Sequence, residues 1–255
     1  MHLVFSTPTA INAGTAAYFH CQRIIMREVG LPSSTQLALL EQYFGCLRAG
    51  HAGQALDIGG LDEAVDSFLA GALDARVLEA RLTAVHRLKT GVPAASLVRI
   101  GALLGGADAV AVAALGRYQE NVGVAFQIMD DVLNLRGLFS NKADKSALAG
   151  VALKTLGEDI TSGKCTFPVV KAFTRLSAGD SAALWEKIRA KSADRVVVDS
   201  VIATLEACGA IDACVEHARL LVEEGFAEID ALLPDSMAKV MLRAFGLYIV
   251  QHAGG

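Results

Sequence analysis

Two adjacent carboxylates, Asp130 and Asp131, lie in the otherwise apolar stretch FQIMDDVLNL (126–135). Two ionised carboxylates in such surroundings repel each other and lose hydration, so a cation is expected beside them. Residues three and four apart share a helix face, which places Gln127 and Asn134 next to the pair. An oxygen-rich cluster without sulfur or imidazole suits Mg²⁺. The sequence therefore predicts a magnesium site on a helix.

A lysine-bearing segment, residues 136–168, follows the acidic pair and contains Lys142, Lys145, Lys154 and Lys164. Connections of this length are usually functional. Magnesium often completes its shell with substrate phosphates, and nearby ammonium groups would help to expel a pyrophosphate leaving group. The alternative for the aspartate pair is a solvated face or a salt-bridge partner. The apolar context and the lysines favour the metal and diphosphate interpretation.

The elements that must position these residues are predicted to be helices. Helical period runs through residues 37–58, 61–91 and 107–135 and through most of the chain after Pro168, whereas strand-like alternation is essentially absent. Residues 107–135 are apolar almost all round, which is typical of a helix at the centre of a bundle. We expect one all-α domain over residues 1–255, with C-terminal helices in 173–253.

Composition excludes several classes of protein. The chain has 255 residues, 53% hydrophobic and 20% charged, as expected for a globular domain. Its most apolar window, 100–116, is interrupted by Asp108, so we expect no transmembrane helix. The uncharged first 22 residues lack the basic start of a signal peptide, and polar side chains interrupt them. We expect a soluble, cytoplasmic protein.

Charge and cysteine content exclude two further possibilities. The formal net charge is −4 and no basic patch is present, so nucleic acid is not an expected partner. The five cysteines are scattered without a CxxC pair, which indicates reduced thiols rather than a zinc or redox site. Four histidines, His20, His51, His86 and His217, have no ligand spacing, and we interpret them as ordinary partly buried or surface residues.

Five segments together resemble the trans-isoprenyl (polyprenyl, geranylgeranyl-type) diphosphate synthases. FQIMDDVLN resembles the second aspartate-rich motif of that family. The other matches are HLVFSTPTAINAGTAAYF (2–19), GQALD (53–57), LKTG (88–91) and LKTLGEDITSGKCTFPVVKA (153–172). Their order and approximate spacing agree across residues 2–172, which is more specific than any single match. The resemblance implies an isoprenoid-synthase-type helical bundle around a central cavity.

The resemblance also implies roles for the matching residues. The expected metal ligands are Asp130, Asp131, Asn134 and Asp159. The expected substrate-binding residues are Gln54, Asp57, Lys89, Thr90, Gln127, Lys154 and Lys164, of which Lys89, Thr90, Gln127 and Lys164 are expected to be catalytic. Each also has a structural alternative: the KTG stretch could end a helix with a glycine cap, Gln54 and Asp57 could hold a helix end, and Asp159 could cap a helix.

The implied function is a Mg²⁺-dependent prenyltransferase of isoprenoid biosynthesis that condenses isopentenyl diphosphate with an allylic diphosphate. A homodimer or a heterodimer with a related synthase is implied as well. The product chain length does not follow from the sequence. A class I terpene synthase is less well supported because no NSE-type motif is present. A purely structural scaffold would leave Asp130, Asp131 and the lysine segment unexplained.

The sequence departs from the family in one respect. Adjacent aspartates occur only at Asp130–Asp131, whereas the family carries a first motif, DDxxD, on a helix preceding the segment with which this chain begins. We therefore expect an N-terminally truncated bundle. Three explanations stay open: a reading frame that starts at an internal methionine, a catalytically impaired partner of a complete synthase, or a remnant.

Overall fold

The structure is a computed structural model that describes residues 1–27, 30–137 and 156–251. All regular elements in these ranges are helical, which confirms the predicted all-α class. The helices are α1 (His2–Phe5), α2 (Thr7–Arg27), α3 (Ser33–Gly59), α4 (Asp62–Leu69), α5 (Ala75–His86), the π-helix η1 (Arg87–Gly91), α6 (Val92–Leu104), α7 (Ala109–Arg136), α8 (Glu158–Thr161), α9 (Phe167–Phe173), α10 (Ala178–Arg189), α11 (Arg195–Ala207), α12 (Ala210–Asp230) and α13 (Met237–Gln251).

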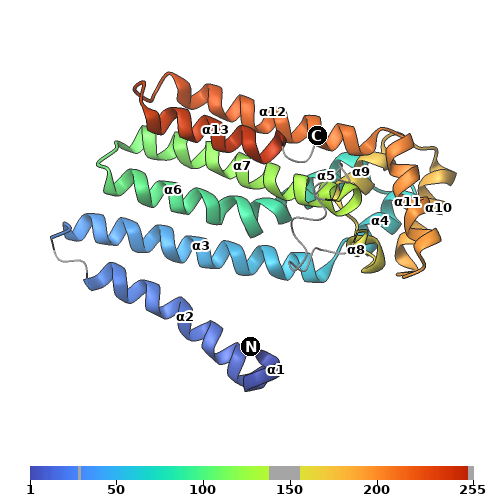
Figure 1. The fold of residues 1–255 in the computed structure, drawn as a ribbon, viewed down its shortest axis with the longest axis horizontal. Helices are drawn as coiled ribbons and strands as arrows, with labels where there is room; N and C mark the ends of the chain where they lie inside the picture. Colours follow the sequence, from blue (N-terminus) through green and yellow to red (C-terminus); the bar gives the residue numbers. More distant parts are fainter. Residues whose placement is uncertain (28–29, 138–155, 252–255) are drawn as a thin grey trace, which may run out of the picture.

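Long helices form one part of the molecule and short helices the other. Helices α3, α6, α7, α12 and α13 lie side by side, and the short helices α4, α5 and α8 to α11 gather at one end of them (Figure 1). Helix α7 packs against α6, α12 and α13. Its C-terminal turns, which carry the aspartate pair, reach into the group of short helices. The acidic motif therefore lies at the end of the bundle where loops and helix ends meet.

Helix α7 begins and ends at recognisable signals. The side chain of Asp108 accepts a hydrogen bond from the amide of Ala111 at 2.8 Å and caps the N-terminus. Gly137 follows the last residue with a φ of 83°, a conformation that glycine adopts without strain. The expected helix over 107–135 is therefore observed almost unchanged.

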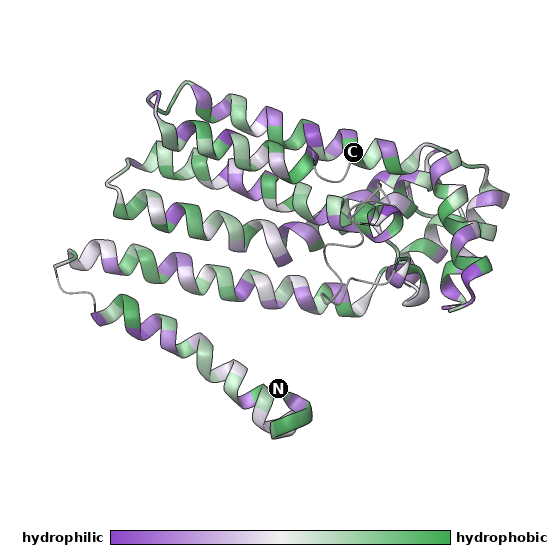
Figure 2. Ribbon diagram, viewed as in Figure 1, coloured by the Kyte–Doolittle hydropathy of each residue, from purple (hydrophilic) through white to green (hydrophobic). Residues whose placement is uncertain are grey.

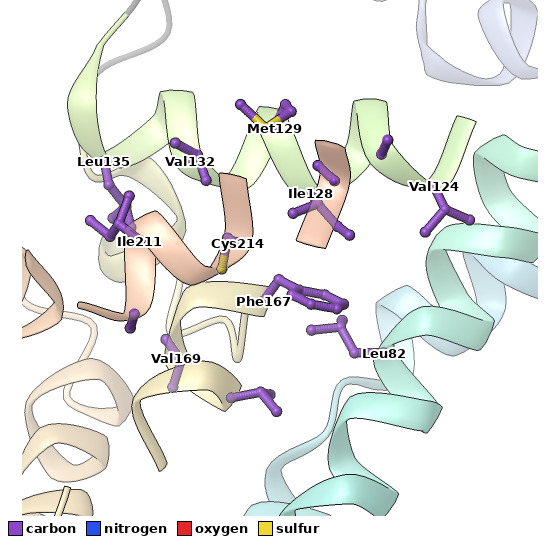
Figure 3. Packing of buried hydrophobic residues seen from close by; sticks show 14 of the residues in the cluster. Leu82, Val124, Ile128, Met129, Val132, Leu135, Phe167, Val169, Ile211 and Cys214 are labelled. Atoms are coloured by element: carbon purple, nitrogen blue, oxygen red, sulfur yellow. The ribbon is translucent and has the colours of Figure 1, made fainter. Parts of the chain in front are cut away.

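The core surrounds α7. Ile128, Met129, Val132 and Leu135 are buried along it, and residues of α5, α9 and α12 pack against them (Figure 3). This agrees with the prediction that α7 lies at the centre of the bundle. Burying side chains of this size stabilises the fold by about 1.5–3 kcal/mol each. The framework behind the aspartate pair is therefore firmly packed.

The segment 61–91 is not one continuous helix. It breaks after α4, where Gly71 adopts a left-handed φ of 74° and Asp74 caps the start of α5 through the amide of Arg76. The apolar periodicity of the sequence continues across this break, so the periodicity did not reveal where the helix ends. The break lets α5 turn back towards α7 and α9, which it contacts.

Helices α1 and α2 differ from the rest of the molecule. Neither contains a buried residue, and the hydropathy colouring of Figure 2 marks hydrophobic positions along both as they diverge from the bundle. Leu3, Val4, Ile11, Phe19 and Ile24 are each exposed by 60% or more. None of the helices in the described ranges is both long enough and apolar enough to cross a membrane.

Candidate functional site

A cavity of about 250 Å³ lies where the end of α7 meets the short helices. Its wall includes the predicted site residues Asp57, Lys89, Gln127, Asp130, Asp131, Asn134, Asp159 and Lys164. They come from α3, η1, α7, α8 and the segment between α8 and α9. Side chains separated by more than a hundred residues in the sequence therefore converge on one small volume.

Asp131 is the most deeply buried carboxyl group of the cavity, with 7% of the residue exposed. Its Oδ2 accepts a hydrogen bond from the amide of Phe167 at 2.9 Å. The pKa of Asp131 is raised to about 8, chiefly by burial and also by the nearby carboxyl groups of Asp159 and Asp130, against the lowering effects of the Phe167 amide and Lys164. Ionising this group is therefore costly unless a cation lies beside it.

Asn134 connects α7 to α8. Its side-chain Oδ1 accepts from the amide of Asp159 at 3.2 Å, and its backbone oxygen accepts from the amide of Gly157 at 2.8 Å. Gly157 has a left-handed φ of 80°, which makes the turn into α8 possible. These contacts hold Asp159 at the cavity wall. The metal-ligand role expected for Asn134 stays a prediction, since this oxygen is already used to position Asp159.

Asp57 lies between two ammonium groups. Its Oδ2 is 2.7 Å from Nζ of Lys89 and 3.9 Å from Nζ of Lys164. Lys164 is half exposed, whereas Lys89 is one-third exposed. Asp57 at the end of α3 thus gathers both predicted diphosphate-binding lysines on the same side of the cavity. Asp57 forms ion pairs with these lysines, so it positions groups that are expected to bind the diphosphate.

The KTG stretch forms the π-helix η1, which continues α5 directly into α6. Gly91 has a φ of −61°, so the alternative of a glycine cap that ends a helix is wrong. Single π-turns within helices often occur at functional sites because they redirect side chains. Thr90 in this turn donates from Oγ1 to Oε1 of Gln127 at 3.1 Å. Thr90 therefore fixes Gln127 beside the aspartate pair.

Two glycines let the neighbouring helices pack closely against η1. A Cβ atom on Gly53 of α3 would lie 2.4 Å from the backbone nitrogen of Lys89. A Cβ atom on Gly123 of α7 would lie 2.7 Å from Cα of Gly91. Both distances are impossible for real atoms, so only glycine lets α3 and α7 approach η1 this far. The glycine of the GQALD stretch thus has a packing role in placing Lys89.

Three expected site residues, Gln54, Thr90 and Lys154, are not among the described residues of this cavity wall. Thr90 contacts the cavity through its hydrogen bond to the wall residue Gln127. Gln54 is exposed and lines an adjoining cleft of about 670 Å³, which shares Asp57 and Lys164 with the cavity. Lys154 lies outside the described residues, as do Lys142 and Lys145.

The sequence interpretation missed His86. It is not an ordinary histidine but lines the cavity with 5% of the residue exposed, and its Nε2 lies 3.8 Å from Oδ2 of Asp131. Burial lowers the pKa of His86 to about 4, so the ring is neutral at neutral pH. The available signal was its position three residues before Lys89, which places both on one helix face.

The oxygen donors of the cavity suit magnesium, an ion that usually takes only some of its ligands from the protein. In the ranges that the structure describes, no three or more His, Cys, Asp and Glu side chains are arranged to hold a metal ion by themselves. Magnesium commonly takes one or two carboxylates, with water and substrate phosphate oxygens completing its shell. Asp130, Asp131 and Asp159 offer carboxylates of this kind. A bound cation would offset the cost of ionising the buried carboxyl group of Asp131.

Comparison with known proteins gives a consistent result. The sequence model of the polyprenyl synthetase family matches residues 1–205. The chain is 30% identical over 237 residues to the short chain isoprenyl diphosphate synthase of Methanothermobacter thermautotrophicus, an alignment that covers 91% of this chain and 65% of the relative. It is 31% identical over 177 residues to the geranylgeranyl diphosphate synthase of Methanosarcina mazei, covering 69% of this chain and 49% of the relative. The chain thus spans between about half and two thirds of these relatives.

Solved structures share the fold. The geranylgeranyl pyrophosphate synthetase of Pyrococcus horikoshii superposes with a TM-score of 0.80 at 23% identity, covering 98% of this chain and 69% of that one. A geranylgeranyl pyrophosphate synthase of Corynebacterium glutamicum, solved with isoprenyl diphosphate and magnesium, gives a TM-score of 0.76 at 23% identity and covers 97% and 64%. At this identity the likeness establishes the arrangement of helices.

Proposed function

The chain belongs to the polyprenyl synthetase family, and on that premise we propose that it binds an allylic prenyl diphosphate together with Mg²⁺ and transfers the prenyl group to isopentenyl diphosphate. The observation that carries this proposal is the convergence of three carboxylates with two lysines on one cavity, all from segments that resemble the motifs of the family. Carboxylates and ammonium groups around one cavity suit a diphosphate that arrives with its cations.

Asp130, Asp131 and Asp159 would hold the magnesium. When bound, the ions would neutralise the charge of the diphosphate and so make pyrophosphate a better leaving group. Asn134 would keep Asp159 in place through the hydrogen bond at 3.2 Å, and the amide of Phe167 would keep Asp131 in place through the bond at 2.9 Å. The protein thus contributes carboxylates whose positions are fixed before the ligand arrives.

Lys89 and Lys164 would contact the diphosphate oxygens. Without ligand both ammonium groups lie within 4 Å of Asp57, and they would exchange part of this interaction for the phosphate oxygens. The allylic C–O bond would break with its electron pair going to pyrophosphate, and the alkene of isopentenyl diphosphate would attack the allylic carbon to form the new C–C bond. The released pyrophosphate would accept the proton that the resulting cation loses. Thr90 would orient Gln127 beside the departing group.

Incorporation of radiolabelled isopentenyl diphosphate into longer prenyl diphosphates tests the activity. We expect this chain alone to be slow, because adjacent aspartates occur only once in it and each missing contact to a charged transition state costs about a hundred- to a thousand-fold in rate. Slow Mg²⁺-dependent product formation that Asp131→Asn abolishes would support the proposal. No product from this chain alone, together with no increase in the rate of a full-length homologue mixed with it, would contradict the proposal.

A catalytically impaired subunit is the alternative reading of the same site. In that case the chain would bind diphosphate and Mg²⁺ without turnover and would raise the rate of a complete synthase added to the assay. A dimeric assembly and a cytoplasmic location belong to the same proposal. The exposed apolar side chains of α1 and α2 support association with a second chain.

A further inference from the structure

We propose that His86 is a positioning residue for Asp131. In this arrangement its imidazole, together with the amide of Phe167, holds Oδ2 of Asp131 and leaves Oδ1 for the cation. This inference rests on the proposed function, in which Asp131 binds magnesium. Two groups from different helices face the same oxygen: the Phe167 amide at the start of α9, at 2.9 Å, and Nε2 of His86 at the end of α5, at 3.8 Å.

The ring of Phe167 fixes the plane of His86. The two rings stack at 5.8 Å with an angle of 27° between their planes. The Phe167 ring also meets His217 edge-on at 5.3 Å, and the ammonium of Lys171 lies 5.4 Å from its centre. Phe167 is fully buried in the core (Figure 3). Through its amide and its ring, this one residue therefore sets both groups that face Oδ2.

Packing alone does not account for a histidine at this position. The ring is 5% exposed, and its Nδ1 has no hydrogen-bond partner among the residues that the structure describes. A buried polar ring loses hydration, so an apolar ring would fill the space at less cost. The polar atom that faces a partner is Nε2, and the partner is the carboxyl group of Asp131. The presence of a histidine here is therefore explained by its position next to the carboxyl group of Asp131, which it helps to hold in place.

The contact at 3.8 Å is longer than a hydrogen bond. A movement of less than about 1 Å would bring Nε2 within hydrogen-bonding distance, and contacts at such sites commonly tighten when the ligand binds. Carboxylates that bind metals are in turn hydrogen-bonded by outer groups, and loss of such a group typically lowers metal affinity by about 10- to 100-fold. The same loss is expected here.

Manganese binding measures this effect without turnover. Electron paramagnetic resonance titrates Mn²⁺ into the full chain in the presence of inorganic pyrophosphate. We expect His86→Phe, which keeps a ring but removes the donor, to weaken Mn²⁺ binding by about 10- to 100-fold. We expect His86→Gln, which can place an N–H near the position of Nε2, to restore most of the affinity. His217→Phe changes a histidine that also contacts Phe167 but does not line the cavity, and it should leave the affinity within about threefold of the wild type.

The outcomes separate the inference from the proposed function. Failure of the wild-type chain to bind Mn²⁺ with pyrophosphate would overturn the proposed function itself. Wild-type binding with unchanged affinity in a folded His86→Phe variant would overturn only the role of His86, as would a folded His86→Gln variant as weak as His86→Phe.

A measurement on the unmodified protein covers the case in which the variants do not fold. Nitrogen-15 NMR of labelled histidine should show the Nε2 resonance of His86 shifting when Mg²⁺ and pyrophosphate are added together. An unchanged His86 resonance in a chain that binds both would overturn the inference.

Discussion

At the scale of single residues, Asp131 determines how the site responds to pH. Its pKa is raised, chiefly by burial, from the ordinary value of 3.8 to about 8, so between these pH values the unfolded chain has lost a proton that the folded chain keeps. The stability that Asp131 contributes is therefore complete at low pH and is lost as the pH rises towards 8. A bound cation would reverse this effect by favouring the ionised form.

Asp131→Asn should abolish this pH dependence. In a metal-free buffer we expect the variant to gain stability relative to the wild type by at least about 2 kcal/mol between pH 5 and pH 8, since each pKa unit corresponds to about 1.4 kcal/mol. Urea denaturation at both pH values, with a chelator present, measures the difference. A constant difference between the two proteins across this range would show that Asp131 titrates normally.

The sequence predicted those residues of this site that lie close together in the chain or in a recognisable segment. Asp130, Asp131, Gln127 and Asn134 share a helix face within two turns, and Lys164 lies in a segment rich in glycine and lysine. The partners that hold them are distant in the chain. Phe167 supports Asp131 from α9, and Asp57 pairs with Lys89 from α3, contacts that follow only from the packing of helices. His86 was overlooked because its contact with Asp131 on another helix also follows only from packing, although its position three residues before Lys89 was a local signal.

At the scale of the elements, the enclosure of η1 by α3 and α7 places Lys89 and Thr90. The sequence predicted the extents of α3 and α7 well, since the expected helical ranges 37–58 and 107–135 lie close to the observed bounds. It could not predict that α5 continues through a π-turn, since the same apolar residues satisfy either geometry. The signal for close packing is the glycine at position 53, whose side-chain position is occupied by the backbone of Lys89.

Substitution of glycine by alanine at two positions of α3 tests this packing. Gly53→Ala should destabilise the fold by about 1–3 kcal/mol, because the new methyl group forces α3 away from η1. Gly45→Ala is the matched control: no atom lies within 4 Å of its Cβ position, so the higher helix propensity of alanine should stabilise by about 0.5–1 kcal/mol. Chemical denaturation gives both values. A Gly53→Ala protein as stable as Gly45→Ala would refute the close contact.

At the scale of the whole molecule, two surfaces stand in contrast. The bundle around α7 contains the buried core, whereas α1 and α2 contain no buried residue and expose their apolar side chains, although they carry no charged residue before Arg23. The uncharged N-terminal sequence is thus explained neither by the core nor by a membrane-spanning helix, since none is found in the described part. Exposed apolar patches of this kind usually mark contact surfaces.

We expect self-association through this surface. Analytical ultracentrifugation should detect dimers whose population rises with protein concentration. Phe19→Glu, at a side chain 65% exposed on α2, should shift the protein towards monomer. Val196→Glu is the control, because Val196 is 75% exposed on α11 at the other end of the molecule. Sedimentation as a monomer at every concentration would exclude this role for α2.

Isothermal titration calorimetry with farnesyl diphosphate tests the central claim most directly. We predict tight binding only when Mg²⁺ is present, and a loss of that Mg²⁺-dependent affinity in Asp130→Ala and Asp131→Asn. Asp235→Asn removes a fully exposed carboxylate far from the cavity and should bind as the wild type does. Equal affinity with and without Mg²⁺, unchanged by Asp130→Ala, would contradict the assignment of this cavity as a magnesium and prenyl diphosphate site.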